Sequence, residues 1–293
     1  MRTRCVLMLA GWLATVSLPA WAGTDWTRVA GALGKSGTEM PGGVYRIGLP
    51  RTDLKVVLDG VEVKPALALG SWLASRSEGD QALVMGDLVL TADEVSPVMQ
   101  KLAEEGIEIT ALHNHLLRTA PATFYMNVRG FGGPAKLAAA LHDALVLSKT
   151  PLTASSGAAP SQIELDTALI DRTLGAKGKV NGGVYQMSLK RAETVNDAGM
   201  AVPEAMGSAE AINFQPTSDG KAAIAGDFVL TANEVNPVLR ILRDNGIEVT
   251  ALHNHMLNDE PRLFFMHFWA NDELPKLAAG LRAALDKIDL ARG

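Results

Sequence analysis

The chain is poor in cysteine and has no surplus of positive charge, and each shortage excludes a class of protein. Its one cysteine, Cys5, cannot form a disulfide framework or, by itself, a thiolate zinc cluster. The 27 Lys and Arg residues against 32 Asp and Glu residues give a formal net charge of −5. A dedicated nucleic-acid binder is therefore not expected, because there is no basic excess to release counterions from a phosphate backbone.

Several sequence signatures are missing as well. The chain contains no Gly-x-Ser-x-Gly, no Walker loop, no dinucleotide-binding glycine fingerprint and no His-Glu-x-x-His. No segment after residue 22 reaches 18 uncharged apolar residues, so no membrane span is expected there. What is present is 293 residues with 47% hydrophobic content. That is enough for about two folded domains and too apolar for a disordered chain.

The first 22 residues have the layout of a secretory signal peptide. Arg2 and Arg4 precede an apolar run over residues 6–18, and the small-x-small triplet Ala20-Trp21-Ala22 follows. We therefore expect cleavage after Ala22 and a periplasmic or secreted mature protein. Cleavage would remove two arginines, no acid and the cysteine, so the net charge would become 25 − 32 = −7.

The rest of the chain is an internal duplication. The triplet His-Asn-His begins at His113 and again at His253, and 253 − 113 gives an offset of 140. Residues 86–117 and 226–257 are identical at 21 of 32 positions. So long a period indicates a duplicated domain rather than a solenoid of short repeats. Residues 149–161 are rich in Pro, Ser, Ala and Gly and are typical of a linker. Repeat domain 1 is then expected over 24–148 and repeat domain 2 over 162–293.

Each repeat is expected to be an α+β domain, a mixed or antiparallel sheet with helices packed on one face. The second repeat should follow the order of the first, but it lacks the Asp59-Gly60 turn that indicates a hairpin over 56–63. The expected elements of the first repeat are a helix near 26–33, strands at 44–49, 56–58, 61–63, 83–90, 107–116 and 123–128, a helix that ends at Gly106, and a last helix through 137–145.

The helix that ends at Gly106 has two alternative starts. Thr91 with Glu94 fits a capping box. Ser96 followed by Pro97 fits an N-cap with proline at the first helical position. We favour the second start, since it keeps proline out of the helix interior.

The histidines carry the main chemical signal. Four of the six lie in the two His-Asn-His triplets, each near the end of an expected strand. Residues i and i+2 of a strand point to the same face, so His113 and His115 should continue the core-facing row of Ile107 and Ile109.

The second repeat offers a third imidazole, because His267 of the following strand can lie beside His253 and His255. Imidazoles at this spacing can share one transition metal, and Met256 and Met266 could add soft sulfur. The sequence therefore predicts a metal site of His253, His255 and His267, with zinc or copper as the expected ion.

The first repeat offers fewer metal ligands. Asn127 stands where the second repeat has His267, and Arg118 lies near the triplet in the sequence. A small polar ligand is an alternative to a metal, and the residues expected to contact it are His113, His115, Asn114 and Asn254. A structural role also stays open, in which the asparagines hold the turns and the histidines satisfy buried backbone groups.

Carboxylates near these motifs are weaker candidates. Glu234 and Glu260 are the candidate general bases, although helix capping accounts better for Glu234. Asp87 and Asp227 each follow a glycine within a strand and are either turn acceptors or carboxylate ligands.

The blocks G-D-L-V-L-T-A-D-E-V-S-P-V (86–98), G-I-E-I-T-A-L-H-N-H-L-L (106–117) and F-F-M-H-F-W (264–269) resemble the LppY/LpqO-like family, known as domain of unknown function 1259. The resemblance covers nearly the whole chain after residue 22, in two tandem copies. It implies an exported protein or lipoprotein, and some members carry a peptidoglycan-binding description. This chain lacks a lipobox and so is similar to the secreted branch. The resemblance also implies histidines after the first triplet, where this chain has residues 127–132 without any, and so favours the second repeat as the functional one.

These features predict an exported soluble binding protein with a histidine-centred site in its second repeat, holding zinc, copper or a small polar ligand. A metal-dependent envelope hydrolase is one alternative. A cell-wall, peptidoglycan or partner-binding module with structural histidines is another. The sequence leans toward a binding protein rather than an enzyme.

Overall fold

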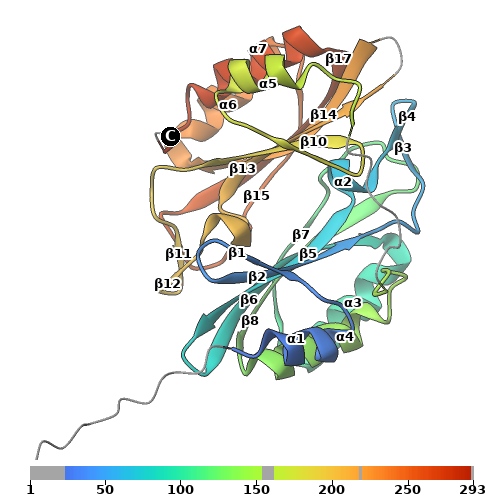
Figure 1. The fold of residues 1–293 in the computed structure, drawn as a ribbon, viewed down its shortest axis with the longest axis vertical. Coiled ribbons are helices and arrows are strands. Elements are labelled where there is room, and N and C mark those ends of the chain that lie inside the picture. Colours follow the sequence, from blue (N-terminus) through green and yellow to red (C-terminus); the bar gives the residue numbers. More distant parts are fainter. Residues whose placement is uncertain (1–23, 154–161, 218–219, 292–293) are drawn as a thin grey trace, which may run out of the picture.

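The structure is a computed structural model that describes residues 24–153, 162–217 and 220–291, and in it the two repeats form two similar halves (Figure 1). The expected signal peptide and residues 154–161 of the expected linker lie outside the described residues. The elements of the first half are α1 (Trp26–Leu33), β1 (Thr38–Met40), β2 (Val44–Pro50), β3 (Val56–Leu58), β4 (Val61–Val63), α2 (Pro65–Ala68), β5 (Gly70–Glu78), β6 (Gln81–Thr91), α3 (Ala92–Glu104), β7 (Glu108–His113), β8 (Thr123–Gly132) and α4 (Pro134–Leu145).

The second half repeats this order, except that two short strands and a 3₁₀ turn take the place of the β3–β4 hairpin and α2, and one further short strand, β16, is added. Its elements are α5 (Thr167–Leu174), β9 (Lys179–Asn181), β10 (Val184–Lys190), β11 (Asn196–Asp197), β12 (Met200–Ala201), η1 (Glu204–Met206), β13 (Ala209–Pro216), β14 (Lys221–Thr231), α6 (Ala232–Asp244), β15 (Glu248–His253), β16 (Asp259–Glu260), β17 (Leu263–Glu273) and α7 (Leu274–Leu285).

Each half is built on a six-stranded antiparallel sheet. The strand order is β1-β2-β5-β6-β8-β7 in the first half and β9-β10-β13-β14-β17-β15 in the second, so the two sheets have the same topology. This confirms the α+β fold in two tandem copies. Strand β5 was not expected, because its sequence GSWLASRSE has too few apolar residues to show a clear strand alternation.

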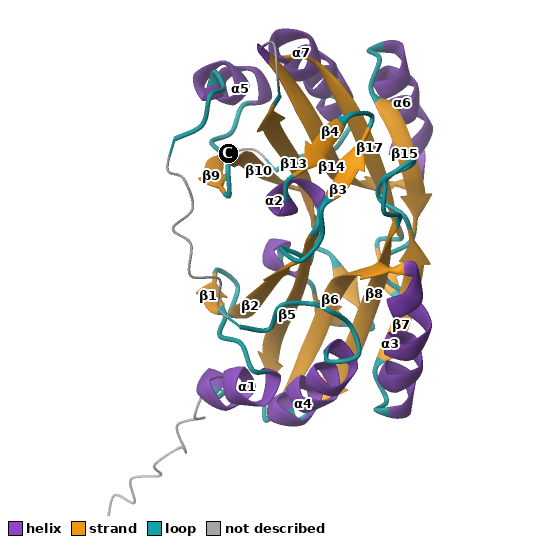
Figure 2. Ribbon diagram, turned by 90° about the vertical axis from the view of Figure 1, so that its right-hand side faces the viewer, coloured by secondary structure: helices purple, strands orange, loops and turns teal. Residues whose placement is uncertain are grey.

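Helices cover one face of each sheet. Three helices, α1, α3 and α4, pack on the first sheet, and α5, α6 and α7 pack on the second (Figure 2). In the first half the buried side chains between helices and sheet include Leu33, Leu88, Leu102 and Leu141. Burial of these apolar faces supplies the main favourable free energy of each half.

The other face of each sheet packs toward the other repeat. In β6 every residue from 82 to 90 is buried, so this strand has no solvent-facing side. Two apolar clusters combine residues of both repeats; one contains Tyr125 and Trp269, and the other contains Met85 and Phe265. The repeats therefore share a buried interior, and in Figure 2 the two sheets face each other across it.

Each repeat also sends a segment across to the other sheet. α2 of the first repeat lies on the second sheet, where Asn213 Nδ2 donates a hydrogen bond to the Leu67 carbonyl at 2.9 Å. In return, β12 and η1 of the second repeat lie against β2 and β5, and Arg76 Nη1 donates to the Ala201 carbonyl at 3.1 Å. These exchanged segments fix the relative position of the two sheets.

The helix after β6 begins at the capping box. The Thr91 N–H donates to Glu94 Oε2 at 2.9 Å, and α3 starts at the next residue. The start at Ser96 that we favoured is wrong, because Pro97 lies inside α3. The capping box satisfies two backbone donors at the helix start, which offsets the one hydrogen bond that the proline removes.

Glu94 also neutralises a buried arginine. Arg51 is 0% exposed, and its Nη1 lies 2.8 Å from Glu94 Oε2. Burial acts to raise the pKa of Glu94, but hydrogen bonds from Arg51 and from two backbone N–H groups outweigh it and hold the pKa below its ordinary value. In the second repeat Arg191 pairs with Glu234 in the same way, at 2.9 Å.

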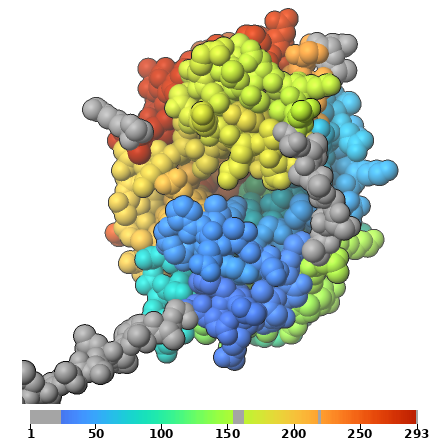
Figure 3. Space-filling model, viewed as in Figure 1, coloured from blue at the N-terminus to red at the C-terminus, as the bar shows by residue number. Residues whose placement is uncertain are grey.

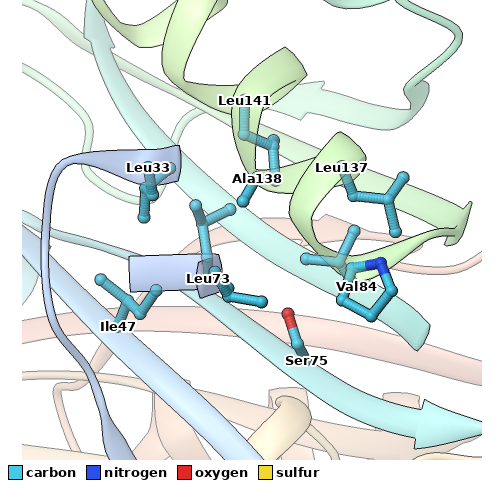
Figure 4. A pocket seen from close by; sticks show the side chains of 10 residues that line it. Leu33, Ile47, Leu73, Ser75, Val84, Leu137, Ala138 and Leu141 are labelled. Carbon is cyan, nitrogen blue, oxygen red and sulfur yellow. The ribbon is translucent and has the colours of Figure 1, made fainter. Parts of the chain in front are cut away.

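A small gap of about 10 Å³ lies in the helix-side core of the first repeat, between Leu33, Leu73, Leu137 and Leu141 (Figure 4). This is room for about one water molecule.

None of the described helices is both long and apolar enough to cross a membrane.

We predict that Glu94→Gln lowers the free energy of unfolding by about 2–3 kcal/mol at neutral pH, because Arg51 stays buried with weaker compensation. The folded pKa of Glu94 is lowered, so its contribution is present above the ordinary carboxyl pKa and is lost as the pH falls through the lowered value. The difference from the parent, measured by urea denaturation, should therefore shrink below about pH 4. Glu104→Gln, at an exposed position of the same helix, is the control, and equal losses in both variants would contradict the prediction.

Candidate metal site between the repeats

A β-bulge decides which way the first histidine triplet faces. Ile109 of β7 pairs with Val128 of β8, and His113 pairs with Tyr125. Ile109 and His113 are four residues apart, whereas their partners are three apart. The strand therefore contains one extra residue near Thr110, where the register shifts.

The extra residue places the histidines on the face opposite to the preceding isoleucines. Ile107 and Ile109 pack into the helix-side core, whereas His113 faces the second repeat. Our expectation that the histidines continue the row of isoleucines is wrong for this reason. β15 has the same irregularity between Val249 and Ala251, so both triplets turn toward the space between the sheets.

Four imidazoles from both repeats meet in that space. One ring nitrogen from each of His113, His115, His253 and His267 lies within 4.8 Å of each of the others. The rings form two stacked pairs, with centroid distances of 3.5 Å for His113 and His253 and 3.6 Å for His115 and His267. This buried cluster could hold a metal ion. It takes two histidines from each repeat, so it is not confined to the second repeat as the sequence had suggested.

His255, one of the three expected ligands, lies outside the cluster. Its ring centroid is 6.0 Å from that of Trp72 and 4.7 Å from that of Phe265. Its Nε2 lies 3.4 Å from the Asn127 amide nitrogen. The expected set of His253, His255 and His267 is corrected accordingly. The position that would give His255 a partner imidazole in the first repeat is occupied by Asn127.

Backbone carbonyls fix the tautomers of two cluster histidines. His253 Nδ1 lies 2.6 Å from the Asn254 carbonyl and His267 Nδ1 lies 3.2 Å from the Gly226 carbonyl. A carbonyl only accepts, so both Nδ1 atoms carry the proton and both Nε2 atoms present a lone pair. These two Nε2 atoms are 2.9 Å apart. Two lone pairs at this distance repel each other unless both atoms bind one cation.

The other two histidines are less constrained by hydrogen bonds. Neither ring nitrogen of His113 has a hydrogen-bond partner in the described part of the chain. His115 stacks on Tyr125 with a centroid distance of 3.5 Å, and its Nε2 lies 3.3 Å from Asp87 Oδ2. Both rings thus keep a nitrogen available inside the cluster.

Asp87 and Asp227 flank the cluster at equivalent positions of the two repeats. Asp227 Oδ1 lies 3.7 Å from His267 Nε2, and among the described residues the Oδ1 atoms of both aspartates lack a hydrogen-bond partner. Burial raises the pKa of Asp87 to about 7, an effect that the Arg46 charge partly offsets. Burial and the neighbouring Asp87 raise the pKa of Asp227 well above its ordinary value.

The cluster is uncharged at neutral pH. Burial is the largest cause that lowers the histidine pKa values, to about 4 for His253 and well below the ordinary value for His113, His115 and His267. Mutual repulsion between the imidazolium forms lowers the last three further. The site therefore presents neutral imidazoles, the protonation state that metal binding requires of histidine, beside two buried aspartates.

Hydrogen bonds between the repeats hold the two triplets in place. Thr110 Oγ1 donates to the His255 carbonyl at 2.7 Å, and Thr250 Oγ1 donates to the His115 carbonyl at 2.5 Å. Asn254 Nδ2 donates to the Thr110 carbonyl at 2.9 Å. Asn114, with its amide nitrogen turned toward neighbouring carbonyls, donates to those of His113 and Thr123 at 3.2 Å. Both triplet asparagines, expected to bind a ligand, thus have their donors engaged by the backbone.

The remaining candidates from the sequence lie elsewhere. Glu234 is committed to Arg191 and to the start of α6, and Glu260 is an exposed residue of the short strand β16. Met266 is buried in the helix-side core of the second repeat, on the face opposite to His267. Arg118 binds Asp59 and Glu248 at the surface. None of these side chains belongs to the histidine cluster.

A large cavity opens onto the cluster. It has a volume of about 1320 Å³, and its lining includes His115, His267, Asp87, Asp227 and Arg46. The space-filling view shows a recess where the first repeat (blue) and the second repeat (yellow) meet (Figure 3). The cluster is therefore reachable from solvent along the boundary of the repeats.

Comparisons with known proteins add a family match without an activity. A family profile described as Domain of Unknown Function (DUF1259) matches residues 27–147 and again residues 168–287. No curated protein matches significantly. Among solved structures, the trimeric bacterial microcompartment shell protein PduB aligns at 12% identity over 85% of this chain and 89% of its own, with a TM-score of 0.20. EtuB from Clostridium kluyveri aligns at 9% identity over 86% and 90%, with a TM-score of 0.18. Likeness at such TM-scores carries no argument.

We predict that Thr250→Val lowers the free energy of unfolding by about 1–2 kcal/mol, because the buried His115 carbonyl loses its donor from the other repeat. Thr250→Ser keeps the hydroxyl and is the matched control. Thermal or urea unfolding of both variants measures the difference. Indistinguishable stabilities for Val and Ser would show that this hydrogen bond does not hold the triplet.

Proposed function

The chain belongs to the DUF1259 family, in two copies, and from its site we propose that it is a metal-binding protein that holds one transition-metal ion between its repeats. The ion would be bound by His113, His115, His253 and His267. Zinc and copper are the proposed ions, because imidazole suits both. Asp87 and Asp227 would balance the positive charge.

One observation carries this proposal. The Nε2 atoms of His253 and His267 point their lone pairs at each other across 2.9 Å, while both Nδ1 atoms donate to backbone carbonyls. A metal ion bound beside both Nε2 atoms, about 2.0–2.1 Å from each, would replace this repulsion with two coordinate bonds. Ligand histidines of metal sites are held by a hydrogen bond from the second ring nitrogen in this manner.

The dimensions of the cluster also favour a single ion. With metal–nitrogen bonds of about 2.0–2.1 Å, two ligand nitrogens can be at most about 4.2 Å apart. The four nitrogens spread over no more than 4.8 Å. Side-chain movements would therefore bring the four nitrogens within bonding distance of one ion.

Export belongs to the same proposal. Residues 1–22 carry the expected signal peptide, and the mature protein would then have no thiol to compete for the metal. Mass spectrometry of the secreted chain would find Gly23 at the N-terminus; an intact leader on the exported protein contradicts cleavage.

A metal-dependent hydrolase is a second candidate, favoured by the carboxylates beside the site. Asp87 Oδ2 lies 3.3 Å from His115 Nε2, and Asp87 also lines the cavity through which a substrate would enter. It could accept a proton from a metal-bound water. Asp87 and Asp227 replace Glu234 and Glu260 as candidate bases. Metal-loaded protein that cleaves 4-nitrophenyl acetate, with loss of the activity in Asp87→Asn, would favour this candidate; equal cleavage by both contradicts it.

We predict that tag-free protein binds about one equivalent of zinc or copper, and that His113→Ala and His253→Ala each weaken binding at least roughly tenfold. Each variant removes one ligand, and the two come from different repeats. Metal analysis after dialysis measures the content, and competition with a chromogenic chelator measures the affinity.

His255→Ala and His142→Ala are the matched controls, because both histidines lie outside the cluster. They should retain the metal. If the parent protein holds no metal above background, the proposed metal-binding function is wrong. If His113→Ala binds the metal as tightly as the parent, the metal ligands would belong to the second repeat alone.

A further inference from the structure

The cavity above the histidine cluster is larger than an ion requires. Its volume of about 1320 Å³ exceeds the roughly 300–1000 Å³ that pockets for small molecules usually have. Its lining runs from the exposed Lys177 and Lys179 of the second repeat to Asp87, His115 and His267 at the cluster. A molecule in the cavity can thus contact the cluster and the two repeats together.

Arg46 of β2 places a positive charge inside this cavity. Its guanidinium carbon lies 4.1 Å from the centroid of the Trp72 ring, and its Nη1 donates to the Ala205 carbonyl of the second repeat. No carboxylate of the described residues lies within ion-pair distance of it. Burial lowers the pKa of Arg46 to about 10, and the Asp87 charge partly offsets this effect.

An arginine held in this way is incompletely compensated. Arg46 is half-buried, and a cation partly removed from water gains free energy from a counter-charge and from hydrogen bonds. The structure gives Arg46 one carbonyl and one aromatic face, and its Nε and Nη2 groups have no hydrogen-bond partner in the described ranges. These donors form part of the planar fork that binds a carboxylate through two parallel hydrogen bonds.

The second repeat shows that the fold does not require this arginine. The strand registers show that Gln186 is the equivalent of Arg46 in the second repeat, and that Ala211 is the equivalent of Trp72. Gln186 Nε2 donates to the Ala66 carbonyl at 2.7 Å and so has a structural contact. The same sheet therefore forms with glutamine and alanine at these positions. The pair of Arg46 and Trp72 thus occurs in the first repeat and has no counterpart in the second.

The charges around the cavity favour one negative charge on the ligand. Arg46 supplies one cation without a carboxylate partner, and the exposed Lys177 and Lys179 would attract an anion toward the opening. Asp87 and Asp227 lie at the floor and add no positive charge there. A carboxylate, with one negative charge, therefore matches the single unpaired cation better than a phosphate dianion.

We infer that the cavity binds a carboxylate-bearing organic molecule, with Arg46 over Trp72 as the anchor of the carboxylate and the histidine cluster as the floor of the site. The part of this inference that concerns the floor rests on the proposed metal function. The anchor does not, because the contacts of Arg46 involve no cluster histidine.

The test measures binding of benzoate and gluconate to the full exported chain by titration calorimetry, with inorganic phosphate and glucose as comparison probes. Metal-loaded and chelator-treated protein are titrated side by side, and metal content is measured in the same samples. We expect at least one carboxylate to bind with a dissociation constant below about 1 mM and Arg46→Gln to weaken it at least roughly tenfold.

Arg46→Gln copies the residue of the second repeat, and Arg46→Lys keeps the charge without the fork and should give intermediate affinity. Lys190→Gln, at an exposed cavity residue that pairs with Glu204, is the matched control and should bind like the parent. Equal carboxylate binding by Arg46→Gln, equal binding of phosphate, or no carboxylate binding at 10 mM probe (about ten times the expected constant) overturns the inference. If the parent holds no metal, the proposed function fails separately. The chelator-treated samples then decide, since Arg46-dependent binding supports the anchor and its absence overturns it.

Discussion

The packing of the two sheets against each other is the constraint on which the rest of the structure depends. Helices cover one face of each sheet, so the second face can be apolar only because the other repeat covers it. The same contact removes water from the histidines and from Asp87, which is why the imidazoles are neutral and the carboxyl pKa is raised. A separate repeat would expose its apolar face and would hold only half of the cluster. The site exists because the interface exists.

Within this interface, backbone groups rather than side chains orient the cluster. The carbonyls of Asn254 and Gly226 fix two imidazole tautomers, and reciprocal threonine hydrogen bonds fix the triplets against each other. Such positions are set by the sheets, so the nitrogens are arranged before any ion arrives. The duplication also leaves each repeat free to diverge. Asn127 against His267 and Arg46 against Gln186 are differences that one fold accommodates, and they make the site asymmetric.

Much of the fold could be predicted from the sequence because its signals are local. The duplication, the apolar strand around Val89, the glycine at the end of α3 and the capping box at Thr91 are each visible within a few residues. The expected helix start at Ser96 was wrong. It took into account the hydrogen bond that Pro97 removes from the helix, but not the two backbone donors that the capping box satisfies. β5 escaped notice because its strand character comes from pairing with β2 and β6 and not from its composition.

The sequence by itself determined that the chain is a duplicated α+β protein of a known family and that histidine is its chemically distinctive residue. It also held an unused signal, since a strand such as β6 that is apolar on both faces needs a second partner. Only the tertiary structure decided which histidines meet. One extra residue near Thr110 places His113 on the opposite face of the sheet. The rule that alternate residues of a strand share a face does not predict such a bulge. Contacts between residues some 140 positions apart are set by how the two sheets pack, so the cluster and Arg46 in its cavity became visible only in three dimensions.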